Sequence, residues 1–196
     1  SARDWVRAEP ANAAAWLALA HDEPGARAEA LAGLQQARRH RLHYGALTAL
    51  MLQHWPPGQP EYLQLMQSFQ MINMESVLSV GALAGALALR DLCPGDLAPG
   101  SARREVCDGV VRQMTERADT LAARGQGIAL ARRLGWPPDV VQAMQADHDT
   151  LSAAVLPPVA DDEQPYGCHA LAARRRHLAE VARLGEVGAA RAARQR

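Results

Sequence analysis

Two short groups of residues combine side chains that can do chemistry. Cys168 and His169 pair a thiol with a base, but neighbours at a helix start point about 100° apart, whereas a catalytic dyad needs facing side chains. His40 and His43 are three residues apart and could share a helix face as metal ligands. Neither histidine has an obvious third ligand, so a solvated, arginine-rich helix end is the simpler interpretation.

A third group includes His148 and Asp149. The run Ala-Leu-Ala-Arg-Arg-Leu-Gly at 129–135, followed after a helix by His148-Asp149, resembles the HD phosphohydrolase family, an all-helical fold. The resemblance implies a metal-bound hydroxide as nucleophile. The family's first metal-binding histidine is missing from 120–126, and Thr150-Leu151 replaces the usual Gly-Lys. One imidazole and one carboxylate cannot hold two metals, so a hydrolase of this family is only the alternative hypothesis. The principal hypothesis, a non-enzymatic binding protein, includes no catalytic residue, metal or cofactor.

The chain has three cysteines, which leave the redox state open. Cys93 ends one expected helix and Cys107 lies about two turns into the next, so a helical hairpin could bring them within bridging distance. Closing this 15-residue loop would stabilise the fold by about 3 kcal/mol in the entropic model. Two reduced core cysteines are the alternative. Cys168 could instead pair with either, and the sequence does not choose among the three connectivities.

Charge and hydropathy exclude several partners. The 21 acidic and 21 basic residues balance, and every basic residue is arginine, so no global field favours nucleic acid. The weakly polar run 77–89 is too short to span a bilayer, which takes about 20 residues.

The chain starts at Ser1 rather than methionine. A removed export signal or lipid anchor is one reason for such a start, so the missing leader does not favour the cytoplasm. Because a disulfide requires an oxidising compartment, we expect a periplasmic or otherwise exported protein, with the cytoplasm as the alternative.

Helical periodicity between proline and glycine breaks predicts an all-α fold. About eight helices are expected in antiparallel hairpins, at 13–21, 25–39, 42–54, 60–91, 101–124, 126–135, 138–152 and 168–192. They would form one helical-hairpin domain at 1–153, an acidic Pro-rich loop at 154–167 and an Arg-rich C-terminal helix at 168–196 that packs on the same domain.

The start of the first expected helix resembles a tetratricopeptide repeat. In the run 9–20, a Pro-Asn turn leads to Trp16, Leu19 and Ala20, which match the tryptophan, leucine and small residue of that family. The match covers 9–35 only, because the later aromatic and a second copy 34 residues on are missing. The resemblance implies an irregular solenoid or bundle of helical hairpins that binds a protein or peptide.

The principal hypothesis is therefore a non-enzymatic binding scaffold of an exported bacterial protein, such as an adaptor, a secretion-associated factor or a toxin inhibitor. An aromatic and Met-rich stretch is the candidate lining of its groove, because methionine adapts to varied partners, although core packing is the other interpretation. Its members are Tyr62, Met66, Phe69, Met71 and Met74.

Overall fold

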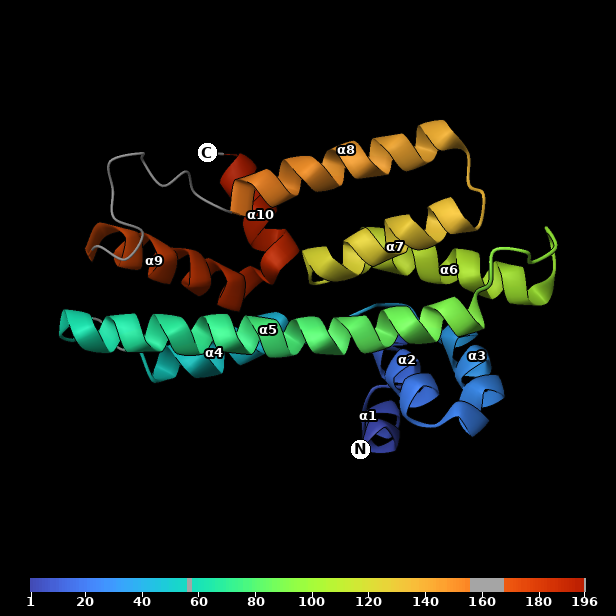
Figure 1. Ribbon diagram of the computed structural model, residues 1–196, viewed down its shortest axis with the longest axis horizontal. Coiled ribbons are helices and arrows are strands. Elements are labelled where there is room, and N and C mark those ends of the chain that lie inside the picture. Colours follow the sequence, from blue (N-terminus) through green and yellow to red (C-terminus); the bar gives the residue numbers. More distant parts are fainter. Residues whose placement is uncertain (56–57, 156–167, 196) are drawn as a thin grey trace. The chain divides into compact units, whose positions relative to one another are not determined.

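The computed structural model describes residues 1–55, 58–155 and 168–195, without the side chains at 61, 68–69, 71–83 and 168–169. All regular elements in this part of the chain are helices, which confirms the expected all-α class (Figure 1). In chain order they are α1 (Ala2–Ala8), α2 (Ala13–Asp22), the short 3-10 helix η1 (Pro24–Ala26), α3 (Arg27–Gln36), α4 (Tyr44–Gln53), α5 (Glu61–Leu92), α6 (Ala102–Arg117), α7 (Leu121–Arg133), α8 (Pro138–Val155), α9 (Cys168–Leu184) and α10 (Glu186–Arg194).

The helix predictions were wrong in several places, among them the helix expected at 25–39, which ends at Gln36. Helix α1 was missed, although Ser1 and Asp4 form a capping box at its start. The helix expected at 101–124 is interrupted, because Ala118 is extended and Thr120 caps α7 instead. The helix expected at 168–192 ends at Leu184, where Gly185 takes a φ of 73° that disfavours any other residue.

The chain divides into two units. Unit 1 contains residues 1–42 and 79–149, and unit 2 contains residues 43–78 and 150–196. The longest helix, α5, contributes residues to both units, as does α8.

The core of unit 1 is built from small and branched side chains. In its main cluster, Leu17 of α2 and Leu34 of α3 join residues from the C-terminal end of α5 and from α6 and α7, such as Met114 and Ile128. Helices α6 and α7 approach closely at Gly127, where a Cβ atom would lie 2.7 Å from Cβ of Met114. A second cluster packs α1 against α2 through Val6 and Leu19.

In unit 2, α4 packs on α9. The two helices are close enough that a Cβ atom on Gly45 would lie 2.9 Å from the backbone oxygen of Val181. Trp55, just after α4, is 1% exposed and packs on Leu178 of α9. Arg175 Nε donates to the Trp55 backbone oxygen over 3.0 Å, which ties the end of α4 to α9.

Candidate binding surface on helix α5

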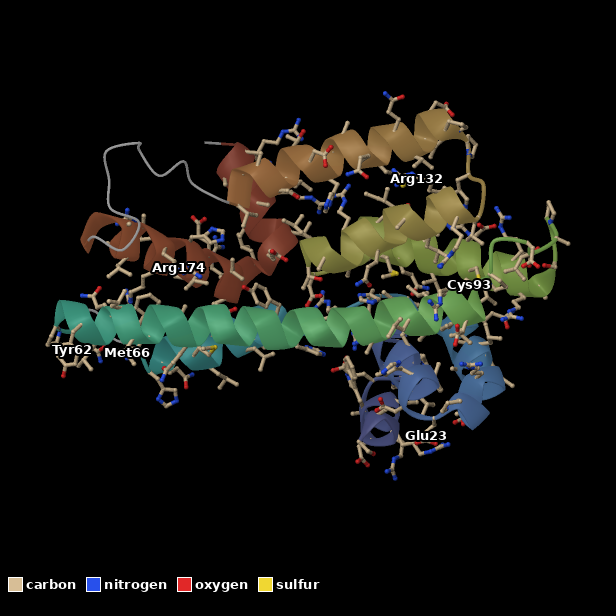
Figure 2. All side chains as sticks on the ribbon, viewed as in Figure 1. Glu23, Tyr62, Met66, Cys93, Arg132 and Arg174 are labelled. Carbon is tan, nitrogen blue, oxygen red and sulfur yellow. A yellow bond between two sulfur atoms is a disulfide. The ribbon has the colours of Figure 1, made fainter. Side chains whose placement is uncertain are left out.

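Tyr62 and Met66 are the exposed apolar residues at the start of α5. They are one helical turn apart, so they lie on the same face, and their exposed fractions are 65% and 55%. Figure 2 labels both at the N-terminal end of this helix. Side chains as exposed as these are not part of a packed core. Core packing, the alternative interpretation of this stretch, therefore does not apply to Tyr62 and Met66.

Local hydrogen bonds hold this end of α5 in place. The backbone oxygen of Pro60 accepts from the amides of Leu63 and Gln64, which forms the first turn. Gln64 Nε2 donates to the backbone oxygen of Gln59 over 2.8 Å, and Gln67 Nε2 donates to that of His54. Because His54 follows α4 directly, the Gln67 bond connects the second turn of α5 to the end of α4.

Leu50 of α4 is a further exposed apolar residue of unit 2 that the sequence analysis missed. It is 56% exposed, and α4 is apolar on most of its faces, so periodicity does not reveal which leucine stays in solvent. Three of the six large apolar side chains that are exposed in the described residues thus occur between positions 50 and 66. The side chains of Phe69, Met71 and Met74 lie outside the described residues.

Cys93 and Cys107 lie at disulfide-bonding distance. Their sulfur atoms are 2.03 Å apart, their Cα atoms are 5.8 Å apart, and both residues are 0% exposed. The pair joins the residue after α5 to the second turn of α6, and it lies within the main core cluster of unit 1. Of the pairings that the sequence leaves open, the structure contains this one, in which Cys168 takes no part.

His148 and Asp149 do not converge on a shared metal position. Asp149 accepts a 2.8 Å hydrogen bond from Gln145 Nε2 on the same helix. The His148 imidazole lies beside Gly125, since a Cβ atom there would be 3.5 Å from His148 Nε2. Gly125 falls in the region where the HD resemblance requires another histidine. No group of three or more histidine, cysteine and acidic side chains that could hold a metal occurs in the part of the chain that the structure describes.

Arg124 is a buried charge next to this region. It is 6% exposed, and its Nη2 atom donates to Asp147 Oδ2 over 2.5 Å, pairing α7 with α8. Because Asp147 is 44% exposed on its side chain, this ion pair is partly in water. The sequence pattern did not single out either residue, since an arginine in the first turn of a helix is normally solvated.

His40 and His43 do not share a helix face, so the possible metal pair was wrong in its geometry. His40 is 4% exposed in the loop after α3. His43 is the residue before α4 and has a left-handed backbone, with φ of 59°. Burial lowers the pKa of His40 to about 4, although the nearby Asp119 carboxylate acts in the opposite direction. His40 is therefore neutral near pH 7. The side chains of Cys168 and His169 lie outside the described residues.

Comparison with known proteins identifies no relative of this chain. No family model matches the chain, and no curated protein and no solved structure is significantly similar to it.

Proposed function

We propose that this chain is a non-enzymatic helical scaffold that binds a protein or peptide through the exposed start of α5. The observation that carries the proposal is the exposure of Tyr62 and Met66 on one face of a helix that Gln67 bonds to the end of α4. Tyrosine and methionine are both enriched at protein interfaces. The tyrosine ring buries much area at low entropic cost, and the flexible methionine thioether adapts to the shape of the partner.

The partner that fits this surface is an apolar segment, such as one face of an amphipathic helix. Such a segment would cover side chains that otherwise keep a large apolar area in water. Neither Tyr62 nor Met66 needs an opposite charge, so binding should depend little on salt.

We further propose that the protein works in an oxidising, exported compartment. The Cys93–Cys107 pair supports this location, because disulfides persist mainly outside the reducing cytoplasm. In the described residues, no helix has the length and apolarity that a membrane crossing requires.

The binding proposal is tested by the double variant Tyr62→Ser/Met66→Ser, compared with Val140→Ser as matched control. Val140 is also an exposed apolar residue, at 38%, but it lies on α8. The tagged proteins are used to capture partners from native lysate, and a protein recovered with the unsubstituted chain is then measured for affinity against each variant. We expect the double variant to bind at least about tenfold more weakly and Val140→Ser to bind normally.

Equal affinity of the double variant and the unsubstituted chain for every recovered protein would contradict this surface assignment. Both variants should fold as the unsubstituted chain does, because substitutions of exposed side chains change stability by only about 0.5 kcal/mol.

A further inference from the structure

The loop between α3 and α4 is an ordered segment with one buried ionisable side chain. We call residues 37–42 the strap. Its three arginines, at positions 38, 39 and 41, are exposed, whereas His40 points inward and is 4% exposed. The Nδ1 atom of His40 is buried and has no hydrogen-bond partner. Burial of an imidazole whose Nδ1 atom has no partner favours the neutral form.

On one side, the strap is hydrogen-bonded to the start of α2. The amide of Ala13 donates to the Arg39 oxygen over 2.8 Å, and that of Arg38 donates to the Ala11 oxygen over 2.9 Å. Asn12 completes this side: its Nδ2 atom donates to the Arg41 oxygen and its Oδ1 atom accepts from the Arg41 amide, both over 2.9 Å.

On the other side, the strap is bonded to the end of α6 and to the α6–α7 junction. Gln113 Nε2 donates to the Ala37 oxygen over 2.6 Å, and Arg117 Nη1 donates to the Arg38 oxygen over 3.1 Å. The Leu42 amide donates to Asp119 Oδ1 over 2.9 Å, and His40 forms an isolated bridge with Ala118. His40 thus occupies the middle of a segment that joins two parts of unit 1.

We propose that the strap is an acid-sensitive latch, in which protonation of His40 releases residues 37–42 from α2 and from the α6–α7 junction. An imidazolium at this position would be a buried charge, and leaving the site would return it to water. Opening would also expose the backbone groups of Ala11, Ala13 and Ala118 that the strap covers.

The charged groups around the strap do not remove the cost of protonation. Asp119 is the acidic group that favours the imidazolium, yet burial outweighs it and the pKa of His40 stays near 4. Glu9 lies 3.6 Å from Arg39 and is thereby engaged in an ion pair. The α6 segment bonded to the strap also carries one exposed carboxylate, Glu116, which is not among the groups that shift the pKa of His40. The other charged side chains there are cationic and oppose a further positive charge: Arg38, Arg39, Arg41 and Arg117.

The size of the effect follows from the difference between the closed-state pKa of about 4 and the ordinary value of 6.5. Between pH 7 and pH 4.5, the ratio of open to closed strap should rise on the order of 50-fold. The closed strap is therefore most stable at neutral pH and is progressively weakened as the pH falls toward 4.

Hydrogen exchange followed by NMR between pH 7 and pH 4.5 tests this proposal. We expect the protection factors of the strap amides, such as those of Arg41 and Leu42, to fall by tens of times and to lie below that of the Leu134 amide in α7 at both pH values. In the His40→Phe variant, which keeps an aromatic ring but cannot titrate, the strap amides should show no such fall.

Three outcomes would overturn the latch. They are strap protection that does not change with pH, the same fall in His40→Phe, and strap protection equal to that of Leu134 at both pH values, which would indicate that the strap opens only by global unfolding. If His40→Phe does not fold, the NMR titration of the His40 ring in the unsubstituted chain decides: a pKa near 4 supports the latch, and a pKa of 6 or above refutes it.

Discussion

The indole ring of Trp16 lies directly over Gly33, so that a Cβ atom at position 33 would be only 2.1 Å from Cε2 of the ring. This contact joins α2 to α3, and the ring is held in place because Trp16 Nε1 donates to the Pro10 oxygen over 2.8 Å. The ring can therefore not move aside easily, and position 33 accepts no larger residue than glycine.

Gly33→Ala should destabilise unit 1 by about 3 kcal/mol or prevent folding, because the added methyl group would overlap the indole. Denaturant unfolding followed by circular dichroism measures the effect. Gly109→Ala in α6 is the matched control, since a Cβ atom there meets nothing within 4 Å. It should stabilise the protein by about 0.5–1 kcal/mol through reduced chain entropy. A Gly33→Ala variant as stable as Gly109→Ala would contradict the close contact.

Asn12 is the N-cap of α2 and also bonds to the strap. Asn12→Ala should therefore lower the free energy of unfolding by about 2–4 kcal/mol. Its Oδ1 atom accepts from the Ala14 amide, and its Nδ2 atom donates to Arg41 and to Glu9. Asn12→Ser separates the two roles, because serine caps a helix but is too short to form both bonds to Arg41. Thermal unfolding should place Asn12→Ser between the alanine variant and the unsubstituted chain, and a serine variant as stable as the unsubstituted chain would show that the strap bonds contribute nothing.

Removal of the disulfide should lower the free energy of unfolding by about 3 kcal/mol, the entropic value for a loop of this length. The double variant Cys93→Ala/Cys107→Ala tests this in urea unfolding, with Cys168→Ala as the control. Thiol titration of the unreduced, denatured protein should find one free thiol per chain, that of Cys168. Three free thiols in protein made under oxidising conditions would contradict the bond.

Acid should weaken the fold in a defined pH range. Above pH 6.5, His40 is neutral in both the folded and the unfolded state. As the pH falls below 6.5, only the unfolded chain takes up the proton, so the free energy of unfolding falls until the pH nears 4. The total loss from this residue is at most about 3 kcal/mol.

The measurement is urea unfolding at a series of pH values, with His40→Phe as the control. His40→Phe should have the flatter dependence of stability on pH between 6.5 and 4. Identical slopes in the two proteins would mean that another group is responsible.

The sequence by itself determined the helical class and most helix positions, because these depend on local periodicity and on breakers such as Pro60 and Pro138. It also indicated the possible pairing of Cys93 with Cys107, since a short loop between two helices brings them close. Local pattern sufficed for these features because each depends on residues near one another in the chain.

Only the tertiary structure decided the features that depend on distant residues. Helix α6 ends at Arg117 because Ala118 and Asp119 contact the strap, almost 80 positions earlier in the chain. His40 was taken for a solvated residue among arginines, yet the bonds on both sides of the strap bury it. Tyr62 and Leu178 are both apolar positions on helices, but packing buries only Leu178. Burial depends on which surfaces meet after the chain folds, and the local pattern does not contain that information.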